Sequence, residues 1–575
     1  MIKLKKILNI LSKEHTQKLP FIILAMLIGA GFEVLGLSLI IPLLDVITNI
    51  SQSKFAEFIS SYYPMLNNEQ VIILTIVLFA LIYIIKGFYL ALLARIISDF
   101  VFGVKVSINK RLIEYYIKAP YEFHLKNNSS SLIRNITIEA RTLVFHTLIP
   151  LLVIATESLV IIAFIIFLLW LEPQGTIIVA SLLLFTGLLF QRLIKNFMEE
   201  IGTTRLNADG LIVQKVQESI GGIKDIKVLL KEDVFIEHFL KHNLLSAKAD
   251  SQHYTWSQFP RMYLETIGVV TLSALLLFLT INSADSVKTI PTFGLFALAA
   301  FRLLPSANRI MISLSGMKYS SSVIGNIHQQ LNEAKMLQIP STYEYEAMDS
   351  ISFTKSIDIQ NISHSYNDSE NNSLNDISIS IKKGERIGII GKSGAGKSTF
   401  IDVILGLLAP MSGTITVDGK SIYKNLNGWQ QIIGYVQQDV FLLDDSILKN
   451  IVFGVHEENI DHEKLNQVVK EAQLDDMVCS LSEGLHTQLG ERGLRLSGGQ
   501  KQRIGIARAL YHKSSVLVFD EATSALDTET ENEIMSTISN LKSDQTIIIV
   551  AHRLSTLKYC DRIVELSKGS ISKTL

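Results

Sequence analysis

The sequence predicts a membrane-spanning α-helical part followed by an α/β domain of the phosphate-binding-loop (P-loop) NTPase class. Three observations support this prediction. Six apolar stretches within about the first 312 residues are long enough to cross a bilayer. After a polar segment at 336–355, the composition becomes that of a soluble α/β domain. In this second part, the run Gly391-Lys392-Ser393-Gly394-Ala395-Gly396-Lys397-Ser398 has the spacing of a loop that wraps phosphate.

Length and composition limit the classes of function. At 575 residues the chain is too long for one core. A mean hydropathy of +0.33 with only 19% charged residues is too apolar for an ordinary soluble protein. The formal net charge is −1, so we expect no nucleic-acid partner. Cys479 and Cys560 lack the spacing of metal ligands, and we expect both to be reduced and inert.

The predicted membrane spans alternate with short and long connections. They cover about 19–47, 70–95, 146–170, 175–195, 263–282 and 290–312. The long connections, 96–145 and 196–260, are rich in Lys and Arg, whereas the opposite ones offer only Lys54 and Lys288. The long connections and both termini should therefore be cytoplasmic.

The segments that flank the spans also have helical patterns. Leu4, Ile7, Leu8 and Leu11 share one helical face, which predicts an N-terminal helix in the membrane interface. The long connections should continue the spans as helices and turn back at 119–121 and 231–233, where they could meet the ATPase part. The outer connection 48–69 is either a short interfacial helix or the frayed end of the first span.

Several charged residues fall within or near the predicted spans. Because charge is costly in lipid, these side chains should face protein or an aqueous cavity. Pairing that only holds helices together and a pathway for an anionic cargo both remain open as explanations. The residues are Glu33, Lys86, Glu157, Glu265, Arg302 and Arg309.

The glycine-rich run lies in the context that a phosphate-binding loop requires. A predicted strand at 387–390 precedes it, and a predicted helix at 399–405 follows. Glycines leave room for backbone N–H groups to surround phosphate, and the helix N-terminus adds its positive dipole end. Lys397 would reach the β and γ phosphates of a nucleotide, and the Ser398 hydroxyl would bind Mg²⁺.

Three further segments complete a candidate nucleotide site. The predicted strand 516–519 ends in Asp520, which would hold Mg²⁺, and Glu521, which would take the proton of the attacking water. The predicted strand 547–550 leads to His552, which could sense the γ-phosphate. The segment 496–500, with Ser497, Gly498, Gly499 and Gln500, begins a predicted helix and forms a second anion site.

Together these segments resemble the nucleotide-binding domain of ATP-binding cassette (ABC) transporters, and the six preceding spans resemble the exporter half-transporter layout. The resemblance implies ATP and Mg²⁺, and a homodimer in which the Ser497 segment of one copy closes on the ATP of the other. It implies that Tyr366 stacks on adenine, that Gln438 contacts Mg²⁺ and the attacking water, and that the segment ending at Asp527 communicates between copies. It also assigns nucleotide contacts to Gly391, Ser393, Gly394, Ala395, Gly396 and Thr399. Gln437 departs from the proline that this family commonly has there.

A closer resemblance involves the membrane part. Residues 259–265 and 301–310 resemble those of the PglK-type flippases, which move polyprenyl-pyrophosphate-linked oligosaccharides across bacterial inner membranes. The resemblance implies substrate-cavity roles for Arg261, Arg302 and Arg309, and for Lys86, where that group has arginine. Lysine keeps the charge but loses the two-pronged geometry of a guanidinium group.

The sequence therefore predicts a multi-pass bacterial inner-membrane protein with a transmembrane domain at 1–335, a linker at 336–355 and a nucleotide-binding domain at 356–575. Its predicted function is ATP-driven flipping of a lipid-linked glycan by a homodimer surrounded by membrane lipids. An exporter of lipids, such as lipid A, or of hydrophobic drugs is the alternative. An ATP-gated channel or regulator is a further one, and the six spans argue against a soluble DNA-repair ATPase.

Overall fold

The computed structural model describes residues 2–48, 50, 53–171, 173–282, 286–336, 351–366, 372–494, 496–512, 514–522, 528–539, 541, 544–551 and 554–575. Most of the segment predicted as a linker lies outside these residues. The chain divides into two compact units. One comprises Met1–Ala119 and Phe123–Pro340, and the other comprises Pro120–Glu122 and Ser341–Leu575.

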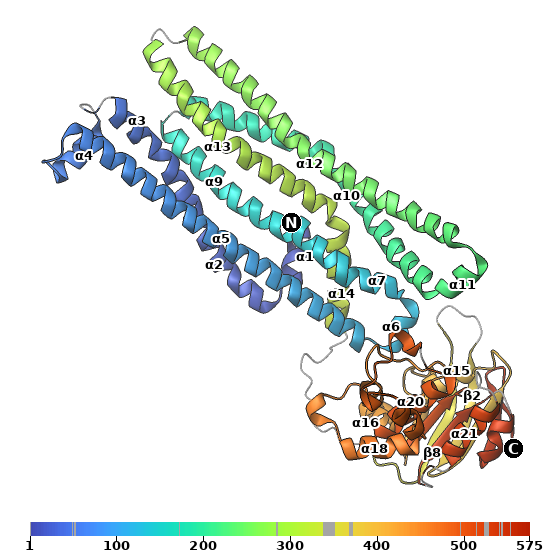
Figure 1. Cartoon of the computed structure of the whole chain (residues 1–575). Coiled ribbons are helices and arrows are strands. Elements are labelled where there is room, and N and C mark those ends of the chain that lie inside the picture. Colours follow the sequence, from blue (N-terminus) through green and yellow to red (C-terminus); the bar gives the residue numbers. More distant parts are fainter. Residues whose placement is uncertain are drawn as a thin grey trace. The chain divides into compact units, whose positions relative to one another are not determined.

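The first unit is helical. Its long helices are α2 (Lys13–Ser38), α5 (Asn68–Lys118), α9 (Ile149–Leu171), α10 (Pro173–Gly221), α12 (Glu232–Asn282) and α13 (Ser286–Tyr319), which run alongside one another (Figure 1). Shorter helices are α1 (Ile2–Ile10), α3 (Ile40–Thr48), α4 (Lys54–Tyr62), α6 (Tyr121–Lys126), α7 (Ser129–Arg134), α8 (Ala140–Leu143), α11 (Ile223–Leu229) and α14 (Ser321–Met336). Two π-helical turns, η1 (Asn135–Glu139) and η2 (Val144–Leu148), join α7 and α8 to α9.

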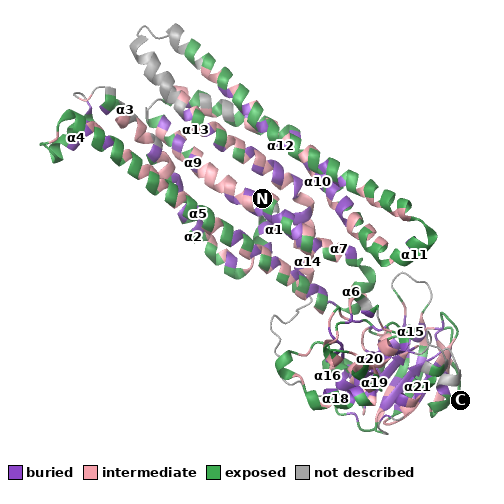
Figure 2. Ribbon diagram, viewed as in Figure 1, coloured by how far each residue is buried: buried purple, intermediate pink, exposed green. Residues whose placement is uncertain are grey.

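Five of the six predicted spans fall largely on these long helices, and the first extends over α2 and α3. Within the described residues, three helical stretches are long and apolar enough to cross a membrane: Lys13–Gly36, Asn68–Lys118 and Ser129–Trp170. Many side chains of α5 and α12 are exposed (Figure 2), and the exposed ones include Ile84, Phe88, Met262 and Val269. Exposed apolar side chains of this density are expected where lipid, not water, surrounds a helix.

The first span differs from its prediction as one continuous helix. The structure divides it at Leu39 into α2 and α3. Pro42 lies in the first turn of α3 and has no N–H to donate to the carbonyl of Ser38, which accounts for the break.

The N-terminal segment forms the predicted helix, α1, and its place in the membrane interface stays a prediction. Ile7 and Ile10 are fully buried and pack in a cluster with α5 and α14, whereas Leu8 is exposed. The outer connection also contains a true helix, α4, capped by Ser53. Ile59 of α4 is buried in a cluster with Val46 and Val71, so the frayed-end interpretation is wrong.

The predicted turning points interrupt the helices as expected. α5 ends at Lys118, directly before Ala119 and Pro120. α11 ends at Leu229, and Leu230 takes the left-handed conformation with φ 52° before α12 begins. The predicted contact of these turns with the ATPase part stays a prediction.

The second unit contains two sheets. An antiparallel sheet has the strand order β2-β1-β4-β5, formed by β1 (Ser356–His364), β2 (Leu374–Lys382), β4 (Ser412–Val417) and β5 (Lys420–Ser421). A mixed sheet has the order β10-β9-β3-β8-β7-β6, formed by β3 (Arg386–Gly391), β6 (Ile433–Val436), β7 (Val516–Asp520), β8 (Thr546–Val550), β9 (Arg562–Ser567) and β10 (Ser570–Thr574). The neighbours β9, β3, β8, β7 and β6 run parallel, as the predicted α/β class requires.

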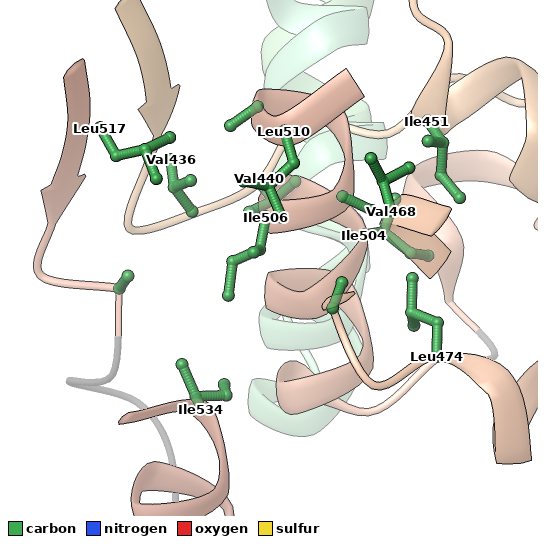
Figure 3. Close-up of a cluster of buried hydrophobic side chains, with 14 of the residues drawn as sticks. Val436, Val440, Ile451, Val468, Leu474, Ile504, Ile506, Leu510, Leu517 and Ile534 are labelled. Carbon is green, nitrogen blue, oxygen red and sulfur yellow. The ribbon is translucent and has the colours of Figure 1, made fainter. Parts of the chain in front are cut away.

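The second unit also contains helices. They are α15 (Lys397–Ile404), α16 (Leu426–Gln431), α17 (Ile447–Ile451), α18 (His462–Glu471), α19 (Asp475–Ser480), α20 (Gly498–Tyr511) and α21 (Thr528–Ser539), with short 3-10 turns between some of them. Of these, α15 and α20 contact strands of the mixed sheet. α20 lies within a buried apolar cluster in which Ile504, Ile506 and Leu510 meet side chains of β6, β7 and α18 (Figure 3). Cys560 packs against this cluster, and burial raises the pKa of its thiol to about 12, so this cysteine is inert as predicted.

Candidate nucleotide-binding site

The glycine-rich loop connects β3 to α15, which is the predicted strand, loop and helix. Gly391 ends β3 against another strand, and a Cβ there would lie 2.5 Å from the carbonyl oxygen of Leu566. Gly396 caps α15 with φ 97°, a conformation that favours glycine, and a Cβ there would lie 2.6 Å from the Ser373 carbonyl oxygen. The sequence therefore keeps this loop free of side chains where the backbone curls.

A hollow of about 1050 Å³ opens above the loop and the carboxyl end of β7. Most predicted contacts to nucleotide and metal line it. They are Ser393, Gly394, Ala395, Gly396, Lys397, Ser398, Thr399, Gln438, Asp520 and Glu521. Residues from three distant segments thus meet at one end of the parallel sheet, where ligands bind in such folds.

Lys397 is almost completely buried, with 6% of its surface exposed. Its Nζ donates a hydrogen bond to the Gly391 carbonyl oxygen at 3.0 Å, and it lies 3.7 Å from Glu521 Oε1. These contacts hold the ammonium group over the loop, where a polyphosphate would need a cation.

Asp520 and Glu521 are the two carboxylates at the end of β7, and a third carboxylate, that of Asp402, interacts with Asp520. Burial raises the pKa of Asp520, while the Tyr435 hydroxyl donates to its Oδ2 at 3.2 Å. Burial and the nearby Asp520 raise the pKa of Asp402, on α15, to about 6. Glu521 has φ 49°, and its N–H donates to the Val550 carbonyl oxygen at 2.9 Å.

This setting fits Mg²⁺. Burial is the main cause of the raised pKa values of Asp520 and Asp402, and a divalent cation bound there would favour the charged carboxylates. Ser398, Gln438 and Asp520 all line the hollow and offer the hard oxygen ligands that Mg²⁺ prefers. When bound with ATP, the ion would neutralise charge on the phosphates.

Two predicted contacts lie next to the hollow without lining it. Tyr366 follows β1, and its hydroxyl lies 3.2 Å from Thr399 Oγ1, so it sits beside the start of α15. Gly391 accepts the bond from Lys397. The predicted adenine stacking by Tyr366 stays a prediction.

The Ser497–Gln500 segment is the N-terminus of α20 and does not line the hollow described above. Ser497 and Gln500 form a capping box, in which the Gln500 N–H donates to Ser497 Oγ at 3.2 Å and the Ser497 N–H donates to Gln500 Oε1 at 2.9 Å. The helix end is therefore preformed, as the prediction of a second anion site requires.

His552 and Asp527 lie outside the described residues, so the structure gives no placement for either. The strand that leads to His552 is present as β8, between β3 and β7.

Sequence reasoning missed part of the hollow's wall. Asn372, Ser373 and Asn375 line it from the start of β2, and Lys568 and Gly569 line it from the turn between β9 and β10. These two segments are joined by the Asn375 N–H, which donates to the Gly569 carbonyl oxygen at 2.7 Å. No local pattern signals such a pairing, because the two partners are almost 200 residues apart.

The charged residues of the membrane helices form ion pairs. Glu33 of α2 lies 2.9 Å from Lys86 of α5 and 2.9 Å from Arg302 of α13. Arg309 of α13 donates to both carboxylate oxygens of Glu157 on α9, one of them at 2.6 Å.

Arg302 and Arg309 also share a partner, because each has a nitrogen 3.4 Å from the hydroxyl of buried Ser306. Arg261, by contrast, is largely exposed and pairs with Glu265 one helical turn away at 2.9 Å. Lys86, Arg302 and Arg309 are thus brought together through Glu33 and Ser306, whereas Arg261 pairs with Glu265.

Comparisons with known proteins agree with this architecture. The ABC transporter transmembrane region family matches residues 19–304, and the ABC transporter family matches residues 374–524. The uncharacterised ABC transporter ATP-binding protein YwjA of Bacillus subtilis is 30% identical over 490 residues, which cover 82% of this chain and 81% of that protein. An ATP-dependent lipid A-core flippase of Cupriavidus metallidurans is 27% identical over 484 residues, covering 82% of this chain and 78% of that protein.

The fold matches a solved structure as well. A bacterial Atm1-family ABC exporter with ATP bound aligns with a TM-score of 0.78 at 22% identity, covering 97% of this chain and 95% of that one. A membrane-helical unit joined to a P-loop ATPase domain defines a class of ATP-driven membrane transporters. This chain belongs to the ABC transporter family, in the exporter half-transporter arrangement, and it uses ATP with Mg²⁺ and hydrolyses ATP. A half-transporter implies dimerisation.

Proposed function

We propose that two copies of this chain form an ATP-driven flippase that moves a polyprenyl-pyrophosphate-linked oligosaccharide across the bacterial inner membrane. Both termini and the ATPase domains lie on the cytoplasmic side in this proposal. The observation that carries it is the charge cluster of Glu33, Lys86, Glu157, Arg302 and Arg309.

The cluster has an excess of positive charge. Three cations face two carboxylates, which leaves one positive charge among helices that cross the membrane. Arg302 Nε is buried without a hydrogen-bond partner within the described part of the chain. A cation among membrane helices without a neutralising partner is costly in free energy unless an anion binds to it. A pyrophosphate group, with its dense negative charge, supplies that anion.

The site residues take the following proposed roles in ATP hydrolysis. Lys397 binds the β and γ phosphates, and Ser398, Gln438 and Asp520 hold Mg²⁺. Glu521 takes the proton of the attacking water, and His552 senses the γ-phosphate. The Ser497–Gln500 helix end of one copy closes on the nucleotide of the other, with Tyr366 at the adenine and Asp527 between the copies. Closure reorients the membrane helices, and hydrolysis resets them.

A second cargo is favoured by a specific observation. The relative from Cupriavidus metallidurans is named as a flippase of lipid A-core, a different lipid. An exporter of lipid A-type lipids or of hydrophobic drugs therefore remains the competing proposal for this chain. It keeps the fold and the ATP site and changes only what enters between the membrane helices.

The test is ATPase activity of the purified protein in liposomes, with a polyprenyl-pyrophosphate oligosaccharide, with lipid A, with a hydrophobic drug or with a neutral lipid added. We expect stimulation by the first, and about tenfold less stimulation in Arg302→Ala, because that variant loses an anion-binding cation. Arg95→Ala serves as the matched control, because it removes an exposed arginine of α5 that lies outside the charge cluster. Stimulation by lipid A or drugs alone, unchanged in Arg302→Ala, would favour the competing proposal.

A further inference from the structure

The loop between β6 and α17, residues 437–446, brings Gln438 to the hollow that faces the phosphate-binding loop. It contains no helix or strand. Asn450 of α17 holds its second half through hydrogen bonds with the backbone of Leu443, and α20, the helix that begins with the Ser497–Gln500 capping box, holds its first half.

One face of α20 supports the loop. Gly505 lets the loop approach closely, because a Cβ there would lie 3.0 Å from Val440 Cγ2. Val436 and Val440 lie against α20 beside Ile506 and Leu510 (Figure 3). About one turn after Gly505, Arg508 donates to the Phe441 carbonyl oxygen at 2.9 Å and to the Asn450 carbonyl oxygen at 2.9 Å.

Gln502 lies on the same face, one turn before Gly505, and it is 94% buried. Its Nε2 donates to the Gln438 carbonyl oxygen at 2.7 Å and to the Gln437 carbonyl oxygen at 3.2 Å. Both amide protons are therefore used on the two peptide groups that flank the position of the Gln438 side chain. The amide oxygen of Gln502 has no hydrogen-bond partner among the residues described.

We propose that Gln502 is a positioning residue for ATP hydrolysis. Its amide fixes the backbone of Gln437 and Gln438 to α20 and so holds the Gln438 side chain at the magnesium and water position. Because α20 is one continuous helix of 14 residues, a movement of its Ser497 end is transmitted to Gln438. The inference rests on the proposed role of Gln438 and is independent of which cargo is carried.

The test compares Gln502→Met with Gln545→Met in the full-length protein. Gln545 is a matched control because its amide also donates to a backbone carbonyl, that of Ser514 at 3.3 Å, and its amide oxygen also lacks a partner within the described residues. We expect Gln502→Met to lower kcat about tenfold and to raise the Mg²⁺ concentration for half-maximal activity. KM for ATP should stay within about twofold, since Lys397 and the loop glycines are untouched.

If Gln502 had only a structural role, its variant would differ from the Gln545 control in neither kcat nor Mg²⁺ requirement. Equal kcat and Mg²⁺ requirement in Gln502→Met and Gln545→Met, at similar melting temperature, would overturn the inference. If Gln502→Met does not fold, Gln502→Leu takes its place, because it also loses the two donated bonds and buries no charge.

A double-mutant cycle separates this inference from the proposed role of Gln438. If Gln502 acts through Gln438, adding Gln502→Met to Gln438→Ala should lower kcat no further. Additive losses would overturn the positioning role alone. An unchanged kcat in Gln438→Ala by itself would overturn the proposed role of Gln438, and this inference with it.

Discussion

At the scale of single residues, Glu521 carries the carboxylate that we propose accepts a proton, and its backbone has an uncommon conformation. It follows β7 directly and takes φ 49°, in the left-handed region that few residues other than glycine adopt. Its N–H is held by the Val550 carbonyl of the neighbouring strand. Such conformations persist where the surrounding structure enforces them, and they gather at functional sites. The carboxylate is thereby aimed into the hollow beside Lys397.

The first prediction concerns this carboxylate. Glu521→Gln should abolish ATP turnover, because the amide cannot accept the proton of water, while ATP binding persists through Lys397 and the loop. Turnover and nucleotide binding of the purified protein are the measurements. Glu529→Gln, an exposed glutamate in α21, should leave both unchanged. Appreciable hydrolysis by the Glu521 variant would contradict the assigned role.

The second prediction concerns Asp418, in the turn between β4 and β5. Burial acts to raise its pKa, but hydrogen bonds from Thr354, Lys355 and Ser356 outweigh this and lower the pKa to about 2. Since an unfolded aspartate has a pKa of about 3.9, the stabilisation is present above pH 4 and disappears as the pH falls toward 2.

Asp418→Asn should therefore lower the melting temperature at pH 7, by the equivalent of about 1–2 kcal/mol for the weakened bonds. Asparagine tolerates the positive φ of this position, so the backbone is preserved. The difference from the native protein should stay constant down to about pH 5 and shrink below pH 4. A pH-independent difference, like that expected for exposed Asp444→Asn, would show that the charge is unimportant.

At the scale of elements, the sequence predicted what local chemistry dictates. The strands beside the P-loop, the helix after it and the turns near Pro120 and Leu230 follow from apolar runs and chain-breaking residues. The break of the first span was missed, although Pro42 could have signalled it. The face of α1 that holds Ile7 and Leu8 was predicted to lie in the membrane interface, and this stays a prediction. Only the packing of α14 and α5 determines that Ile7 and Ile10 are buried.

Other features of the site depend on tertiary structure and had no local signal. The turn at Lys568 and Gly569 reaches the hollow only because β9 pairs with β3. The link from Gln502 to Gln438 joins residues 64 positions apart. The cost of placing charge in lipid was enough to predict that the charged residues of the spans face protein or water. Their pairing through Glu33 and Ser306 could not be predicted from sequence.

The third prediction concerns a buried ion pair between helices of the first unit. Arg205 of α10 donates to Glu139 Oε2 at 3.0 Å and lies 3.2 Å from Asp209, and Glu139 is fully buried. Arg205→Ala should destabilise the protein by about 3 kcal/mol, because it removes the closer of two guanidinium groups beside a buried carboxylate and leaves only Arg134, at 4.0 Å. Thermal unfolding in detergent measures this.

Arg95→Ala is the control for that prediction, because the Arg95–Asp99 pair is exposed on both sides and should contribute about 0–1 kcal/mol. Equal melting temperatures for the two variants would contradict the view that the Glu139 cluster holds α10 against η1.

At the scale of the whole molecule, one copy supplies two different helix ends that we propose bind phosphate. One is α15, whose N-terminus faces the hollow with Lys397 and Asp520. The other is α20, whose preformed cap does not line that hollow. The simplest explanation for both helix ends is a dimer in which each nucleotide lies between the α15 end of one copy and the α20 end of the other. ATP binding then draws two copies together, and this is the step that we propose moves the membrane helices.

The most direct measurement of this claim is a disulfide cross-link between copies. One chain carries Ser393→Cys and the other carries Ser497→Cys, with Cys479, the exposed native cysteine, replaced by serine in both. Glu521→Gln in both chains holds ATP in place. We predict a disulfide between the two different chains that forms with ATP and Mg²⁺ and is lost without nucleotide. Absence of this disulfide in every nucleotide state would contradict the account.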